Sequence, residues 1–256
     1  MSIFLPLYLK FSRKRFQRAF KPLGVIKKQW YLVSVPHETE NFFRAYPFIF
    51  RLSKIGSVVL LMPKNLEHIR SFMKPKQFEI ILYEKSPTIF SEDYRRVAVQ
   101  LGERYFHFLI ELNEPANISL PYLSNFQRRI AFFNKGNFPY FNIQVKNGYT
   151  SLNEFFNIKS EDISDMFHFY SRDLKSIEKK LGKSRPLLFI NNAEEVDWRG
   201  GKIILGKDIM PDDPNIWSVL YTIDAYRGAR DAFYQFALIN DKKILNDEEK
   251  CSSDID

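Results

Sequence analysis

Short apolar runs alternate with segments of helical periodicity from residue 29 onward. The runs are rich in β-branched and aromatic residues and end at breakers such as Pro36 and Pro63, which is typical of buried strands. Strands separated by helices of this length predict βαβ units and a mainly parallel sheet covered on both faces. The predicted strands are residues 30–35, 58–62, 78–83, 106–112 and 129–133, and the predicted helices are 38–54, 65–72 and 91–104.

The second half of the chain repeats this alternation in a shorter form. The Asn147-Gly148 pair is a turn signal, and we place a domain boundary near residues 146–160. Strands are predicted at 186–190 and 202–206, and helices at 161–181, 214–225 and 229–239. The predicted organisation is a basic arm at 1–28, a Rossmann-like domain at 29–150, a smaller α/β domain at 151–245 and a polar tail at 246–256.

The positive charge of the chain is concentrated at its amino end. The net charge is +8, and residues 1–37 hold eight Lys and Arg side chains but no acid. The remaining 30 bases balance the 30 acids, so a uniformly basic nucleic-acid-binding domain is not expected.

Aromatic and aliphatic residues interleave with these cations between Phe4 and Phe20. An amphipathic helix of this kind suits an anionic membrane surface, which we expect as the partner of residues 1–28. Two alternatives stay open: the helix packs on the domain, or its cations contact nucleic-acid phosphates. No nucleic-acid partner is expected.

Cysteine usage and hydropathy indicate where the protein works. The chain has one cysteine, Cys251, so no internal disulfide and no cysteine-based zinc site can form. The apolar run from Ile3 to Leu9 precedes the positive charges, unlike a secretory signal, and no stretch approaches the length of a membrane span. We expect a cytoplasmic protein that is peripheral at the inner membrane.

Common catalytic and cofactor motifs are absent from the sequence. There is no G-x-G-x-x-G, P-loop, H-E-x-x-H or G-x-S-x-G pattern. The four histidines have no metal-ligand spacing, and we expect His107, inside a predicted strand, to be a structural or surface residue. The sequence therefore predicts no metal and no tightly bound cofactor.

Two carboxylates follow predicted strands, where open α/β sheets place their ligands. Glu111 stands at the end of the strand at 106–112, and Glu38 follows the strand at 30–35. Either side chain is a candidate catalytic acid or base. The alternatives are loop solvation and helix capping for Glu111, and a first-turn helix position for Glu38.

The segment from Asp224 to Asp231 is the main candidate in the second half. It is predicted to join two helices, and a helix amino terminus beside two guanidinium groups suits a diphosphate. The alternative is a surface turn in which the arginines pair with Asp224 and Asp231. The candidate binding residues are Arg227, Gly228, Arg230 and Asp231.

Three stretches resemble glycosyltransferase family 9, the lipopolysaccharide heptosyltransferases. Residues 105–112 (YFHFLIEL) are similar to the family strand "yDlvidL", and residues 128–132 (RRIAF) to the following "riGf". Residues 51–63 (RLSKIGSVVLLMP) are similar to "RLSxiGDvvlxxP", and 228–237 to the nucleotide-sugar segment "GxDSGxxHxA". The resemblance implies two Rossmann-like domains of glycosyltransferase B type, the second one truncated, and a nucleotide-diphosphate sugar as ligand.

The same stretches depart from the family at its functional positions. The acid expected to be the catalytic base falls on Ser57. The family's Asp, Ser, Gly and His fall on Arg230, Asp231, Ala232 and Gln235. The predicted strand at 58–62 also conflicts with this alignment, which requires a helix there.

Two hypotheses about function follow. The first is a divergent glycosyltransferase at the cytoplasmic membrane surface, in which Glu38 or Glu111 replaces the lost base. The second is a non-catalytic descendant of the same fold that serves as a membrane-associated binding or scaffold module.

Overall fold

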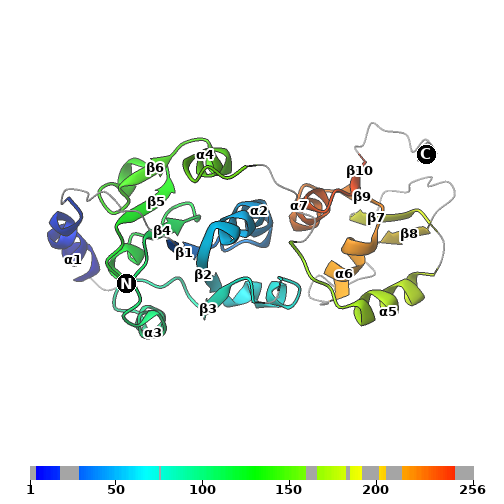
Figure 1. The fold of residues 1–256 in the computed structure, drawn as a ribbon, viewed down its shortest axis with the longest axis horizontal. Helices are drawn as coiled ribbons and strands as arrows, with labels where there is room; N and C mark the ends of the chain where they lie inside the picture. Colours follow the sequence, from blue (N-terminus) through cyan, green and yellow to red (C-terminus); the bar gives the residue numbers. More distant parts are fainter. Residues whose placement is uncertain are drawn as a thin grey trace. The chain divides into compact units, whose positions relative to one another are not determined.

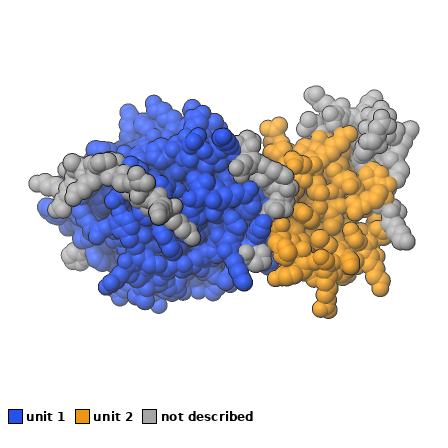
Figure 2. Space-filling model, viewed as in Figure 1, with its two compact units in different colours: residues 1–38, 45–166 blue, residues 39–44, 167–256 orange. Residues whose placement is uncertain are grey.

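The computed structural model describes residues 4–17, 29–74, 76–159, 166–182, 185–191, 202–205 and 215–245. The chain divides into two compact units, shown in blue and orange in Figure 2. Unit 1 comprises residues 1–38 and 45–166, and unit 2 comprises residues 39–44 and 167–256. The domain limits predicted from the sequence stay a prediction.

Unit 1 is built on a six-stranded sheet in the order β3-β2-β1-β4-β5-β6, and every neighbouring pair of strands is parallel (Figure 1). Because all strands run the same way, their carboxyl ends meet at one edge. The strands are β1 (Gln29–Ser34), β2 (Gly56–Pro63), β3 (Glu79–Tyr83), β4 (Phe108–Glu111), β5 (Arg128–Phe132) and β6 (Ile143–Val145).

Both faces of this sheet are covered, as its apolar strands require. On one face, Leu32 and Leu109 belong to a buried cluster that includes Phe16 from the amino-terminal arm. On the other face, the ring of Tyr31 stacks on Phe108 with centroids 5.3 Å apart. The covering elements are α1 (Phe4–Ser12), η1 (Arg13–Gln17), α2 (Thr39–Ile55), η2 (Lys64–Ser71), α3 (Glu92–Leu101), η3 (Leu120–Tyr122), η4 (Lys135–Asn137) and α4 (Gly148–Phe155).

Unit 2 holds a smaller parallel sheet in the order β10-β9-β7-β8. Its aromatic core gathers around Phe43, whose ring lies 4.8 Å from Trp217 and 5.2 Å from Phe236. The elements are α5 (Ser171–Leu181), β7 (Leu187–Asn191), β8 (Lys202–Leu205), α6 (Asn215–Thr222), β9 (Ala225–Gly228), α7 (Ala232–Ile239) and β10 (Lys243–Ile244).

The α/β class, the parallel sheets and the smaller second unit confirm the fold predicted from the sequence. The helix expected at 161–181 is wrong in its first part, since 166–170 are not helical and α5 begins at Ser171. The helix expected at 214–225 is also wrong at its end, because residues 225–228 form β9. The sequence prediction missed α4, β6 and β10.

The described residues of the amino-terminal arm pack on unit 1. This packing is one of the alternatives that the sequence analysis left open. The Tyr140 hydroxyl donates to the Leu9 carbonyl oxygen over 3.0 Å. The ring of Phe16 is buried and meets Tyr122 edge to face, with centroids 4.7 Å apart. Residues 18–28 of the predicted arm lie outside the described part of the chain.

No helix among the described residues is long and apolar enough to cross a membrane.

Truncating the buried ring of the arm should measure how strongly the arm is held. We expect Phe16→Ala to lower the free energy of unfolding by about 3 kcal/mol, because it empties a site in the core of unit 1. Phe11→Ala is the matched control, since that ring is 77% exposed, and it should change stability by less than about 0.5 kcal/mol. Urea unfolding of the full chain distinguishes the two, and equal effects would contradict a docked arm.

Candidate functional site

The carboxyl edge of the unit 1 sheet holds a buried carboxylate. Glu111 is the last residue of β4 and pairs in register with Ser34, the last residue of β1. Its side chain is almost fully enclosed, with 1% of the residue exposed. A buried carboxylate is costly unless hydrogen-bond donors surround it.

Those donors come from the loop that follows β4. The backbone N–H of Asn113 donates to Glu111 Oε1 over 2.9 Å, and the Asn113 side-chain amide donates to the same oxygen over 2.7 Å. The backbone N–H of Asn117 reaches Oε2 over 3.4 Å. Ser34 adds a side-chain hydrogen bond. The carboxylate of Glu111 therefore holds this loop in place through hydrogen bonds from its backbone and side-chain amides.

Asn113 connects the loops that leave β1 and β4. Its amide nitrogen also donates to the Val35 carbonyl oxygen over 3.0 Å, and its amide oxygen accepts from the backbone N–H of His37 over 3.0 Å. Asn117 extends the connection to the loop after β3, since its side chain donates to the Pro87 carbonyl oxygen over 2.9 Å. Three strand ends are thus joined by the amides around Glu111.

Burial controls the ionisation of this edge. Loss of solvation raises the pKa of Glu111 to about 7, against the opposing effect of its hydrogen bonds. Burial, together with the charges of Glu111 and Asp93, raises the pKa of Tyr83. Burial lowers the pKa of His37, which Glu38 partly offsets. Glu111 can therefore hold a proton near neutral pH.

Glu38 lies at the same edge but in a different environment. It is exposed and precedes α2 without a side-chain cap on that helix. Its neighbour His37 is held by Asn113, so the structure brings both predicted carboxylates to one end of the sheet. The sequence prediction named Glu38 and Glu111 as candidates but did not name Ser34 or Asn117. A polar residue at a strand end was the available signal for Ser34.

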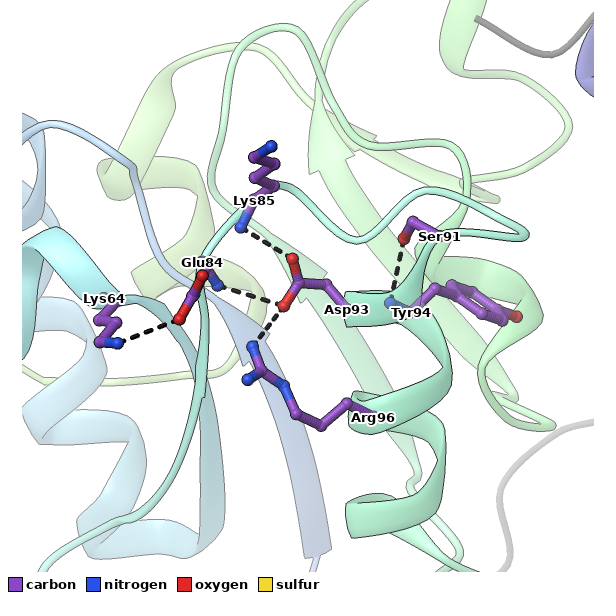
Figure 3. A network of polar contacts seen from close by, with 7 residues as sticks. All are labelled: Lys64, Glu84, Lys85, Ser91, Asp93, Tyr94 and Arg96. Atoms are coloured by element: carbon purple, nitrogen blue, oxygen red, sulfur yellow. Dashed lines mark hydrogen bonds and ion pairs between the residues drawn. The ribbon is translucent and has the colours of Figure 1, made fainter.

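A second polar network fixes the loop after β3 (Figure 3). Asp93, in the first turn of α3, accepts from the backbone N–H groups of Glu84 and Lys85 over 3.2 and 3.0 Å and pairs with Arg96. Burial alone would raise the pKa of Asp93, but these donors lower it. Lys64 pairs with Glu84 over 3.0 Å. The carboxylates of this network have partners, and its role is to hold the loop.

The candidate segment of unit 2 forms a strand, a turn and a helix. The segment lies between α6 and α7, as predicted, but residues 225–228 within it form β9, which the prediction missed. Gly228 has φ +153°, and a Cβ there would lie 2.5 Å from the Asn191 carbonyl oxygen. Only glycine fits this close approach. The turn therefore follows a parallel strand at its carboxyl end.

Asp231 caps α7 with its own side chain. Oδ1 accepts from the backbone N–H groups of Phe233 and Tyr234 over 2.9 and 3.1 Å. The Tyr226 hydroxyl donates to Oδ1 over 3.2 Å, and Asn191 donates to Oδ2. The amino terminus of α7 is thus already occupied by a carboxylate.

The two arginines of this segment differ in exposure. Arg227 is half-buried on β9, whereas Arg230 is exposed in the turn. Asp224, which the sequence-based alternative paired with an arginine of the segment, binds Arg185 over 3.0 Å and the backbone N–H of Leu187 over 2.7 Å. Arg230 makes no polar contact with another described residue, so its guanidinium is available to a ligand.

His107 is the one histidine for which the sequence analysis expected a role. His107 Nδ1 accepts from the backbone N–H of Trp30 over 3.0 Å, which confirms a structural role. Over the described ranges, no group of three or more His, Cys, Asp or Glu side chains could hold a metal ion. The predicted strand at 58–62 is confirmed as part of β2, so the alignment that places the family acid on Ser57 and requires a helix at 58–62 is not supported.

Comparison with known proteins identifies the fold. No protein-family model and no curated protein matches the sequence. A glycosyl transferase family 9 structure from Veillonella parvula matches with a TM-score of 0.61 and 10% identity, over 87% of this chain and 82% of that chain. The E. coli ADP-heptose lipopolysaccharide heptosyltransferase II matches with a TM-score of 0.57 and 10% identity, over 84% and 83%.

A third structure extends the same likeness. The E. coli heptosyltransferase WaaC, with ADP-2-deoxy-2-fluoro heptose, matches with a TM-score of 0.54 and 8% identity, over 84% of this chain and 87% of that chain. The chain therefore has a heptosyltransferase-like fold of glycosyltransferase family 9, with a smaller second domain.

Ionisation of Glu111 should give the protein a distinctive pH dependence. An unfolded glutamate loses its proton near pH 4.5 and the folded one at about 7, so the folded state binds more protons between these values. Stability should therefore fall as the pH rises through this interval, by about 3 kcal/mol, and then stay constant with respect to this group.

Glu111→Gln should remove this dependence, because its side chain cannot ionise. In urea unfolding between pH 4.5 and 8, the free energy of unfolding of the variant should rise relative to that of the wild type as the pH rises. Glu114→Gln, three residues further on and exposed, is the control and should follow the wild type. Parallel pH profiles for wild type and Glu111→Gln would contradict the raised pKa.

Proposed function

We propose that this protein is a divergent glycosyltransferase that uses a nucleotide-diphosphate sugar. The observation that carries the proposal is the fold, which the chain shares with heptosyltransferases over more than four fifths of its length. Two of these relatives are described with ADP-linked ligands or substrates. An ADP-linked sugar is therefore the first donor to test.

Arg227 and Arg230 are the proposed diphosphate-binding residues. They lie at the carboxyl end of β9, where parallel α/β sheets place their ligands. Guanidinium groups pair with phosphate oxygens through two parallel hydrogen bonds. In this proposal, Gly228 lets the chain turn tightly, and Asp231 fixes the turn by capping α7.

Glu38 is the proposed base that accepts the proton of the acceptor hydroxyl. Its carboxylate is exposed, so an acceptor can reach it, whereas Glu111 is enclosed. Glu111 acts as a positioning residue, because Asn113 transmits its position to the loop that carries His37 and Glu38. A base that removes this proton as the new bond forms contributes to transfer.

ADP binding tests the proposed donor site. We expect ADP and ADP-heptose to raise the melting temperature of the full chain, because a ligand that binds only the folded state stabilises it. Arg230→Gln should weaken ADP binding about tenfold, as expected for a lost charge-assisted contact. Isothermal titration calorimetry gives the affinities.

The control for this experiment is Arg172→Gln, which removes an exposed arginine on α5 of the same unit. It should bind ADP like the wild type. An absence of any shift with ADP and ADP-heptose, or equal affinities for all three proteins, would contradict the proposed site.

A non-catalytic binding module is the second candidate. The observation that favours it is the Asp231 carboxylate at the amino terminus of α7, a position that otherwise suits a phosphate. A module of this kind does not release ADP from ADP-heptose in the presence of a lipopolysaccharide acceptor. A coupled assay for released ADP therefore separates the two candidates.

We propose further that the protein works at the cytoplasmic face of the inner membrane, through its arm. The ring of Phe11 is 77% exposed, and Leu7 and Tyr8 are also exposed on α1, beside Lys10. Tyr8 contacts the exposed ring of Phe90, with centroids 5.4 Å apart, which extends the apolar surface beyond the arm. Aromatic rings next to cations favour an anionic lipid interface.

Vesicle sedimentation tests this placement. Phe11→Ser should lower the fraction of protein bound to phosphatidylglycerol vesicles severalfold, because an exposed aromatic anchor is lost. Phe133→Ser, which removes an exposed ring elsewhere in unit 1, should leave binding unchanged. Binding that is equal for all three proteins, or that is insensitive to salt, would refute a role for the arm.

A further inference from the structure

A hollow of about 210 Å³ lies where the amino-terminal arm meets the body of unit 1. Its lining includes Arg15 and Phe16 from η1, and Ser124, Asn125 and Arg129 from the body. Arg129 is the second residue of β5 and pairs in register with Leu109, toward the amino end of the sheet from Glu111, and no residue of the network around Glu111 lines the hollow. The hollow is therefore distinct from the candidate site described above.

Two guanidinium groups share this hollow. Both lie over the ring of Phe16, with Arg129 Cζ 5.0 Å and Arg15 Cζ 5.8 Å from its centroid. The two positive charges are near enough to interact, since the charge of Arg15 acts on Arg129. The lining contains no acidic residue.

The partners of both arginines are neutral. Arg129 donates from Nε to the Tyr140 carbonyl oxygen over 2.6 Å and from Nη1 to the Phe126 carbonyl oxygen over 3.1 Å. Arg15 donates from Nη2 to the side-chain oxygen of Asn125 over 3.2 Å. Within the described part of the chain, neither guanidinium pairs with a carboxylate, and Arg129 Nη2 has no acceptor.

The two positive charges in the hollow repel each other. Burial, and after it the charge of Arg15, lower the pKa of Arg129 to about 10. The docked arm therefore holds a second cationic side chain beside Arg129. An anion between them would compensate both charges.

We propose that this hollow binds a phosphate-bearing anion between Arg15 and Arg129. Paired guanidinium groups present several N–H donors that can bind the oxygens of a tetrahedral oxyanion. Two cations also match the charge of a dianion better than they match the single charge of a carboxylate. Ser124 and Asn125 supply neutral polar groups at the same hollow. Arg15 is exposed, so a ligand can reach the site from solvent.

Occupation of the hollow would strengthen the docking of the arm. Arg15 belongs to the arm and Arg129 to the sheet, so a bridging anion joins the two and removes their repulsion. The ligand is either a free phosphate compound or the phosphate of a lipid headgroup. Both present the same chemistry to the arginines.

The test compares melting temperatures of the full chain in sodium phosphate, sodium pyrophosphate and sodium chloride at equal ionic strength. The wild type should gain stability in phosphate or pyrophosphate relative to chloride. Arg15→Gln should lose most of this gain and bind inorganic phosphate about tenfold more weakly in calorimetry. Arg129→Gln should lose it as well.

Arg13→Gln is the matched control, because Arg13 lies on the same arm and donates to the Phe138 carbonyl oxygen without lining the hollow. It should keep the full gain. Arg15→Gln keeps the test valid even where Arg129→Gln fails to fold, since Arg15 is exposed. An equal gain for Arg13→Gln and Arg15→Gln would overturn the proposal.

Vesicles separate the two sources of phosphate. With phosphatidic acid in phosphatidylcholine vesicles, a lipid-headgroup site predicts that Arg15→Gln sediments less than Arg13→Gln. A site for free phosphate predicts equal sedimentation of both variants, together with the calorimetric loss for Arg15→Gln alone. The absence of both differences would overturn the proposal.

Discussion

A parallel sheet has to be covered on both faces, and this constraint organises the molecule. The strands of unit 1 are apolar on both sides, so helices on one face alone would leave the apolar side chains of the other face in water. One face buries Leu32 beneath a cluster that includes Phe16, and the other stacks Tyr31 on Phe108. The amino-terminal arm is part of this cover. Phe16 of the arm is buried in the core of unit 1, so the arm contributes to the packing of the unit itself.

The same constraint concentrates polar chemistry at the strand ends. Backbone groups that leave a buried sheet need partners, and side-chain amides supply them here. Asn113 and Asn117 connect the loops after β1, β3 and β4 around the carboxylate of Glu111. These hydrogen bonds join the three loops, and Glu38 at the same edge is exposed.

The sequence was sufficient to predict β1 to β5, β7 and β8, whose apolar runs are distinct, but it missed the short strands β6, β9 and β10. The sequence prediction misplaced those elements whose local residue pattern does not show the pairing that they form in the folded chain. Residues 225–228 (AYRG) carry too short an apolar pattern to mark a strand, and they form β9 because β7 and β10 pair with them. Glu111 was recognised as a strand-end acid, but its buried position also depends on Ser34, which comes from the neighbouring strand β1. Such convergence is a tertiary property that spacing along the chain does not reveal.

One helix contributes to both compact units. Residues 39–44 of α2 belong to unit 2, and the rest of the helix belongs to unit 1. The ring of Phe43 lies at the centre of the unit 2 aromatic core, against Trp217 and Phe236. Unit 2 is therefore discontinuous in the chain, and a fragment that starts at residue 167 lacks its central aromatic residue. During synthesis, that core is completed only after the residues of both segments have left the ribosome.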